Sequence, residues 1–124
     1  MTKQEIFDTV ARHLAAQGYR ATDSQGHCKY RTPLGDKCAA GCVIPDNMYA
    51  PHMEGTSVRA WHNFFGITNI ELCVNLQNVH DNESYWTPEN MLKALRRVAS
   101  LYALDPAILD KLDFGLIIPN RLDI

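Results

Sequence analysis

The sequence lacks long hydrophobic runs. None of its 124 residues belongs to an apolar stretch that approaches the about 20 residues needed to span a bilayer. The opening MTKQEIFDTV alternates charged and hydrophobic side chains and lacks the continuous apolar segment of a secretory signal. We therefore expect a protein that stays in the cytoplasm, away from membranes, with its four cysteines as reduced thiols.

The sequence also lacks an excess of charge of either sign. Twelve Lys and Arg residues stand against fourteen Asp and Glu residues, and the isoelectric point is about 6.2. Proteins that bind nucleic acid usually carry a basic domain, and a mimic of DNA would need dense acidity. This balance argues against nucleic acid as a partner and against DNA mimicry.

Sequence motifs of the common enzyme classes are absent. The chain has no glycine-rich phosphate loop, no G-x-S-x-G, no H-E-x-x-H and no kinase or dinucleotide-binding fingerprint. The composition, with 46% hydrophobic and 21% charged residues, is that of an ordinary globular protein. We expect one domain, residues 1–124, with no catalytic residues, no cofactor and no bound metal.

Helical signals dominate what is present. Thr2 and Glu5 have the spacing of a capping box, and apolar residues recur at helical spacing afterwards. They predict a helix over residues 3 to 17. Further helices are expected after Ser57, after a second capping box at Thr68 and Glu71, from Pro88 to about residue 103, and from Pro106 to about Leu112.

A small sheet is expected between the first two helices. The turn signal TPLGD separates HCKYR from KCAAGCVI, as in a short antiparallel hairpin. The fold class predicted from the whole pattern is therefore α+β: a mostly helical single domain with a small antiparallel β-hairpin or meander. The apolar tail FGLIIPNRLDI is expected to be a terminal strand or a docked segment, and pairing between two copies leaves open a homodimer.

The cysteines are interpreted as small apolar side chains of the core. On a strand, Cys38 and Cys42 point to one face, and Cys28 shares a face with Tyr30 on the preceding strand. Free cysteine is among the most often buried residue types. These side chains would then form one apolar surface.

Two alternatives for the cysteines stay open. A zinc site would need His27 or Cys73 to complete spacings that fit the usual zinc signatures poorly. A cysteine nucleophile would need a base from His52, His62 or His80 through a tertiary contact.

Other polar and aromatic groups receive structural interpretations. HDNE, residues 80 to 83, contains residue types of a metal or acid–base site, but its position predicts a solvated helix end. Lys93, Arg96 and Arg97 predict a solvated basic face. Trp61 and Phe65 are expected in the core, whereas for Phe64, Tyr85 and Trp86 both core and surface stay open.

The run CKYRTPLGDKCAAGCVIPDNMYAPHMEG, residues 28 to 55, resembles a segment of small uncharacterised proteins encoded by bacteriophages and prophages of proteobacteria. The shared pattern is C-x-Y-R, K-C-A-x-G, I-P-D and M-E-G, and LQNVHDN at residues 76 to 82 is similar to a later L-Q-x-x-H-D. The resemblance covers about a third of the chain and implies a phage origin.

A phage origin and a lack of catalytic motifs favour a protein that works by binding. We expect a phage-type accessory protein that binds a host protein or complex and inhibits or modulates it, for example in counter-defence. The alternatives are a small metal-dependent or thiol enzyme and a nucleic-acid-binding regulator. Because loops on a rigid scaffold often carry recognition, the expected partner-binding residues are Asp36, Lys37, Asp46, Asn47, Tyr49 and Glu54.

Overall fold

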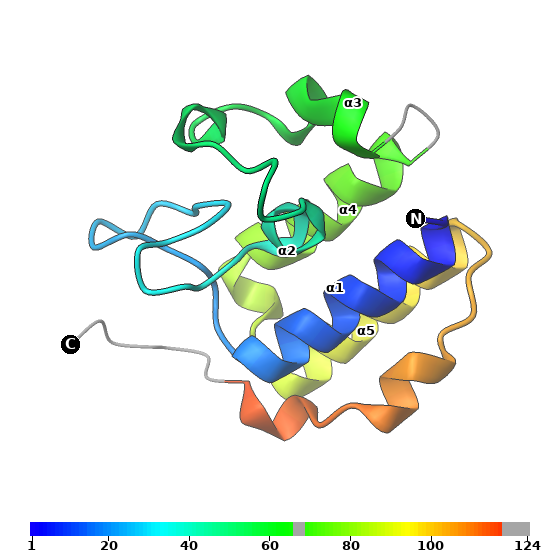
Figure 1. Ribbon diagram of the computed structural model, residues 1–124. Coiled ribbons are helices and arrows are strands. Elements are labelled where there is room, and N and C mark those ends of the chain that lie inside the picture. The colour runs from blue at the N-terminus through cyan, green and yellow to red at the C-terminus, as the bar shows by residue number, and fades with distance from the viewer. Residues whose placement is uncertain (66–68, 118–124) are drawn as a thin grey trace.

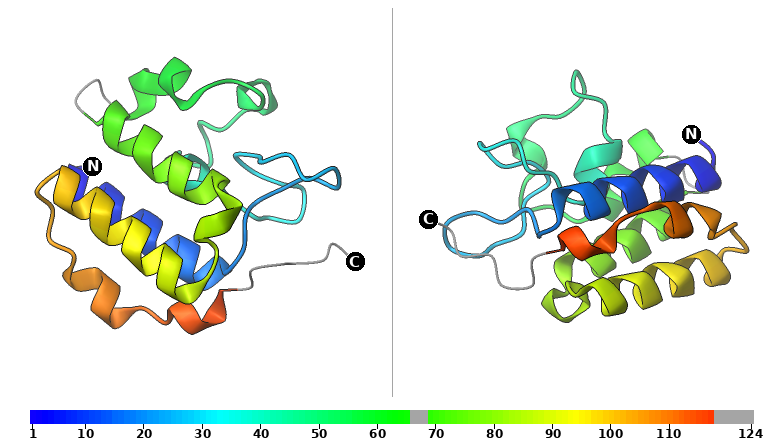
Figure 2. Two further views of the ribbon diagram at one scale, coloured as in Figure 1. Left: turned by 180° about the vertical axis from the view of Figure 1, so that it is seen from behind. Right: turned by 90° about the horizontal axis from the view of Figure 1, so that it is seen from below.

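Three long helices form the body of the protein in this computed structural model, which describes residues 1–65 and 69–117. They are α1 (Lys3–Gln17), α4 (Ile70–Asp81) and α5 (Pro88–Leu101), and they lie side by side (Figures 1 and 2). The shorter helices are α2 (Ala39–Val43), α3 (His62–Phe65) and the 3₁₀ helices η1 (Pro51–Met53), η2 (Val58–Trp61), η3 (Glu83–Tyr85), η4 (Ala107–Lys111) and η5 (Phe114–Leu116).

Helix α1 begins and ends where the sequence predicts. The Thr2 hydroxyl accepts a hydrogen bond from the Glu5 amide at 3.1 Å, and the Glu5 carboxylate accepts one from the Thr2 amide at 2.9 Å. Gly18 ends the helix with a left-handed φ of 79°. A side chain there would be strained and would also collide with the Leu116 carbonyl oxygen, 2.6 Å from the Cβ position.

The other long helices also confirm the sequence pattern. The Thr87 side chain caps α5, and Pro88 is its first residue. In α4 the apolar residues Leu72, Leu76 and Val79, which recur at helical spacing, are buried. Asn69 precedes this helix without a side-chain capping bond, and the predicted cap Thr68 lies outside the described residues.

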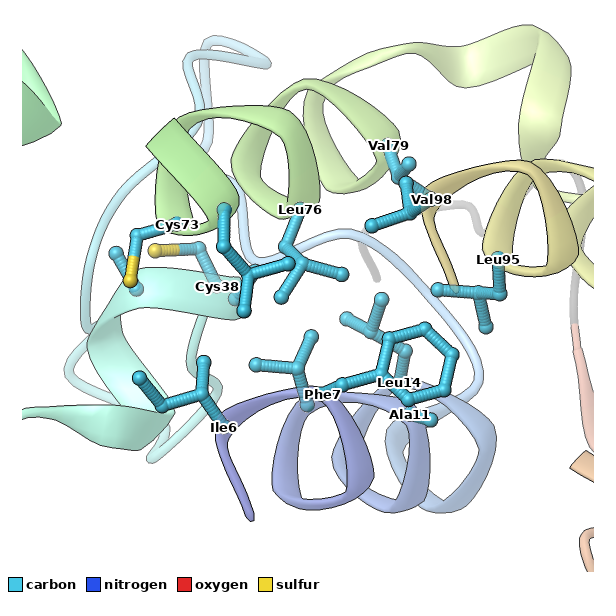
Figure 3. Close-up of a cluster of buried hydrophobic side chains, with 14 of the residues drawn as sticks. Ile6, Phe7, Ala11, Leu14, Cys38, Cys73, Leu76, Val79, Leu95 and Val98 are labelled. Carbon is cyan, nitrogen blue, oxygen red and sulfur yellow. The ribbon is translucent and has the colours of Figure 1, made fainter. Parts of the chain in front are cut away.

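The core lies between α1, α4 and α5. Figure 3 shows Phe7 and Leu14 of α1 facing Leu95 and Val98 of α5, with Leu76 of α4 above them. Fully burying an aliphatic or aromatic side chain of this size contributes about 1.5–3 kcal/mol relative to exposure. These contacts position α4, which carries much of the polar chemistry described below.

The predicted β-hairpin is wrong, and with it the α+β class. Residues 1–65 and 69–117 contain no β-strand; two isolated antiparallel bridges, Thr22 with Cys28 and Arg31 with Lys37, are the only pairing there. The chain forms two successive loops closed by these bridges. Both extend beyond the long helices (Figures 1 and 2). A longer ladder is blocked because the Glu54 carboxylate accepts the amide protons of both Tyr30 and Arg31.

The segment expected to be the second strand is helix α2. Cys38 acts as its N-cap, because its Sγ accepts a hydrogen bond from the Gly41 amide at 3.2 Å. A Cβ at Gly41 would lie 2.0 Å from the Tyr30 carbonyl oxygen. The small residues of AAGCV therefore allow a helix to pack against backbone, rather than fill one face of a strand.

The predicted tail lies partly inside the described chain. Phe114–Leu116 form the 3₁₀ helix η5 instead of a strand. Residues 118–124, which contain the rest of the predicted segment and of the proposed pairing surface between copies, lie outside the described residues.

Candidate functional site: the docking loops and the Asp81 pocket

Three of the six predicted contact residues, Asp36, Tyr49 and Glu54, make hydrogen bonds within the protein that stabilise its loops. Asp36 is buried, with 9% of its surface exposed, and accepts a hydrogen bond from the Tyr19 hydroxyl at 2.8 Å. Glu54 accepts the Tyr30 amide at 2.8 Å. The Tyr49 hydroxyl donates to Glu54 at 2.6 Å. Burial, followed by this bond, raises the pKa of Tyr49 to about 12, so the hydroxyl remains a donor at neutral pH.

Arg31 connects these internal bonds to the surface loop after α2. Its guanidinium donates to the Asp46 carboxylate at 2.8 Å and to the Ile44 carbonyl oxygen at 2.5 Å, and it lies 4.9 Å above the centre of the Tyr49 ring. Lys37 also reaches Asp46, at 3.6 Å. Charge-assisted hydrogen bonds of this kind are the stronger ones in proteins. They hold the loop closed by Arg31 and Lys37 against the loop that follows α2.

The turn 32–36, in which residues 33–35 are exposed, and the exposed segment 45–48 are together called the docking loops. Asp46 and Asn47 are exposed here, as the sequence analysis expects for contact residues. Leu34 is 81% exposed and Met48 45% exposed, and neither was predicted. The signal available in the sequence was a large apolar residue inside each turn, PLG and DNM.

Of the predicted apolar surface, Cys38 and Cys42 are not on a strand: Cys38 caps α2 and Cys42 lies within it. Cys38 and Cys73 are buried together between α2 and α4 (Figure 3). The half-buried Cys42 thiol donates to the Ala39 carbonyl oxygen at 3.1 Å. Burial raises the pKa of Cys38, that of Cys42 to about 12 and that of Cys73 to about 11. Thiols with raised pKa values are poor nucleophiles at neutral pH.

One group of potential metal ligands exists among residues 1–65 and 69–117. Atoms of Cys28, His80 and Asp81 all lie within 4.8 Å of one another. The expectation of a solvated helix end is wrong for His80, because its surface is 0% exposed. The Trp86 indole also donates to the His80 carbonyl oxygen at 2.7 Å.

The hydrogen bonds of His80 argue against a metal at this group. The Ala21 amide, which can only donate, lies 2.9 Å from Nε2, so Nε2 must accept. In a neutral imidazole the proton is then on Nδ1, which faces Asp81 Oδ1 at 2.8 Å. Metal binding would need an unprotonated Nδ1, whereas a ligating histidine normally donates its other N–H.

This arrangement also does not activate Cys28. Neither ring nitrogen of His80 has Cys28 as its hydrogen-bond partner. Burial, followed by the charge of Asp81, raises the pKa of Cys28 to about 11. A nucleophilic cysteine needs the opposite shift. Through its bonds to the Ala21 amide and to Asp81, His80 therefore braces the loop at Ala21 against the end of α4.

A polar pocket lies beside this brace. Its volume is about 230 Å³, and its walls are residues 28–30, residues 54–58 and the α4 side that carries Gln77, Asn78 and Asp81. The Asp81 side chain is 43% exposed, while its Oδ1 also accepts a hydrogen bond from Gln77 at 2.9 Å. We call this cavity the Asp81 pocket. Nothing in the sequence pattern brought its three walls together.

Lys93, Arg96 and Arg97 are all exposed, as predicted for a solvated basic face of α5. Lys93 lies 3.2 Å from Glu89, and Arg96 lies 3.7 Å from Asp110. The aromatic predictions are mixed: Phe65 and Trp86 are buried, whereas Trp61 is only partly buried. Phe64 and Tyr85 pack at the edge of the core.

Comparisons with known proteins identify no relative of this chain. A scan of family models finds no match, and searches of curated proteins and of solved structures find no significant match either. Within the described ranges, no helix combines the length and the hydropathy required to cross a membrane.

Proposed function

We propose that the chain is a phage-type accessory protein that binds a host protein or protein complex in the cytoplasm and modulates it, as in counter-defence. The docking loops are the proposed contact surface. The observation that carries this proposal is the exposure of Leu34, at 81%, at the tip of a turn fixed by hydrogen bonds. The phage origin rests on the sequence resemblance alone.

The docking loops have the features of an interaction surface. Protein interfaces combine apolar anchors with a polar rim, and the docking loops expose both the apolar Leu34 and Met48 and the polar Asp46 and Asn47. The bridge between Arg31 and Lys37 closes the turn, and both residues bind Asp46. A loop already held in shape loses little conformational entropy on binding.

The chemistry of the buried groups supports binding over catalysis. All four thiols have raised pKa values, and the orientation of His80 leaves no ring nitrogen for a substrate or metal. These groups stabilise the fold, which leaves the surface as the part of the molecule that acts.

A charge at the tip of the turn should abolish partner binding without affecting the fold. We expect tagged protein in a proteobacterial lysate to recover a stoichiometric partner. Leu34→Asp should reduce its recovery at least about tenfold, because a charge would enter an apolar contact. The free energy of unfolding should change by less than about 0.5 kcal/mol, since Leu34 is on the surface. Quantitative mass spectrometry and thermal unfolding measure the two effects.

Leu101→Asp is the matched control, because Leu101 is a similarly exposed leucine, at 63%, on α5. It should retain the partner. The proposal fails if no stoichiometric partner is recovered, or if Leu34→Asp and Leu101→Asp retain it equally.

A further inference from the structure

We infer that the Asp81 pocket receives a positively charged side chain, arginine or lysine, of the partner protein. This inference rests on the proposed function, since it names the chemistry of the same partner. It follows from the size, charge and position of the pocket.

The size of the pocket fits one side chain better than a drug-sized ligand. Pockets for drug-sized ligands have volumes of roughly 300–1,000 Å³, whereas the Asp81 pocket has about 230 Å³. One long side chain and its polar head group would fill most of this space. Arginine is also among the residues that contribute most to protein interfaces.

The charge of the walls favours a cation. The lining contains two carboxylates, Glu54 and Asp81, and one ammonium, Lys29, so its formal charge is −1. The Lys29 ammonium also lies 3.7 Å from Asp23, which offsets its charge further. The nearby Arg20 guanidinium lies 3.8 Å from Glu83 and donates to the Asp81 carbonyl oxygen at 3.3 Å. It therefore already meets the carbonyl end of α4 and leaves the Asp81 carboxylate as the acceptor for a second cation.

Asp81 is the group that would receive the cation. It is the last residue of α4, a helix of 12 residues, and the carbonyl groups at a helix C-terminus carry partial negative charge that favours cations. His80 and Gln77 hold one of its oxygens. A carboxylate has about four lone-pair sites, so the 43% exposed side chain can still accept a bond from a guanidinium.

The pocket adjoins the docking loops through Glu54. One wall includes Tyr30 and Glu54, and the Glu54 carboxylate also holds Arg31 and Tyr49. Arg31 in turn binds Asp46 of the docking loops, so one chain of bonds connects the docking loops to this wall of the pocket. A basic side chain of the partner would add a charge-assisted bond to the apolar contact at Leu34.

The inference can be tested without the partner. N-acetyl-arginine amide is titrated into the isotopically labelled protein, and N-acetyl-citrulline amide, which has the same shape but no charge, is the matched ligand. We expect saturable shifts of the amide signals of residues 28–30, 54–58 and 77–81 with the arginine probe only. Asp81→Asn should raise the dissociation constant of the arginine probe about tenfold, since the charge is lost while an acceptor for His80 remains.

Two further variants check the sign of the effect. Lys29→Gln should tighten binding of the arginine probe, because it removes the one ammonium from the lining. Asp110→Asn, at an exposed carboxylate on η4, should leave binding unchanged.

Equal binding of both probes, no saturable shifts at the pocket, or weaker binding in Lys29→Gln would overturn the inference. Recovery of a partner that depends on Leu34 is measured separately, so a failure of this inference can be told apart from a failure of the proposed function.

Discussion

Replacing Gly41 by alanine should destabilise the protein by about 3–5 kcal/mol and lower the melting temperature by more than about 10 °C. Local preference predicts the opposite, since alanine in a helix is favoured over glycine by about 1 kcal/mol. The tertiary contact decides the sign. The new Cβ would lie 2.0 Å from the Tyr30 carbonyl oxygen and 2.8 Å from its carbonyl carbon, and both are backbone atoms that cannot rotate away.

Gly26→Ala is the control for this effect. No atom lies within 4 Å of a Cβ at Gly26, so only its left-handed φ of 81° opposes alanine, at a cost of about 1–2 kcal/mol. Thermal and denaturant unfolding measure both variants. A melting temperature that rises in Gly41→Ala would show that α2 does not pack on the Tyr30 backbone.

Replacing His80 by leucine should cost about 3 kcal/mol, although leucine is similar in size. The buried Ala21 amide would lose its acceptor, which alone costs about 1–3 kcal/mol. The bond from Nδ1 to the Asp81 carboxylate would also be lost. Because this brace holds the loop at Ala21, hydrogen exchange at that amide should become faster than in the native protein.

His62→Leu provides the comparison, since His62 is exposed and should change stability by less than about 0.5 kcal/mol. If the unfolding free energy of His80→Leu matches that of the native protein within the same limit, the brace does not stabilise the fold. Slow exchange at Ala21 in His80→Leu would contradict its proposed role directly.

The long helices could be predicted because their signals are local. The capping box at Thr2 and the Thr87–Pro88 start each lie within a few residues of the helix that they begin. The hairpin prediction failed because the decisive contacts come from far along the chain. Glu54 binds the amides of Tyr30 and Arg31, and Gln77 binds the amide of Ala40 at 2.9 Å.

The candidate site was predictable only in part for the same reason. Turn residues indicated where loops would be, so Asp46 and Asn47 lie on the docking loops. Which loop residues face inward depends on partners such as Tyr19 for Asp36, and no local pattern contains that information. The position of His80 near the end of a helix predicted a solvated side chain. The chain after Gly18 folds back over it, and the Ala21 amide binds its ring.

The proposed surface function requires His80 and Asp81 to form a structural brace and not a metal or catalytic site. Heteronuclear NMR of the His80 ring, with and without equimolar zinc, measures this most directly. We predict a protonated Nδ1, an unprotonated Nε2 and no change on adding zinc. An Nδ1 that loses its proton to a stoichiometrically bound zinc ion, with binding lost in Cys28→Ser, would contradict the account.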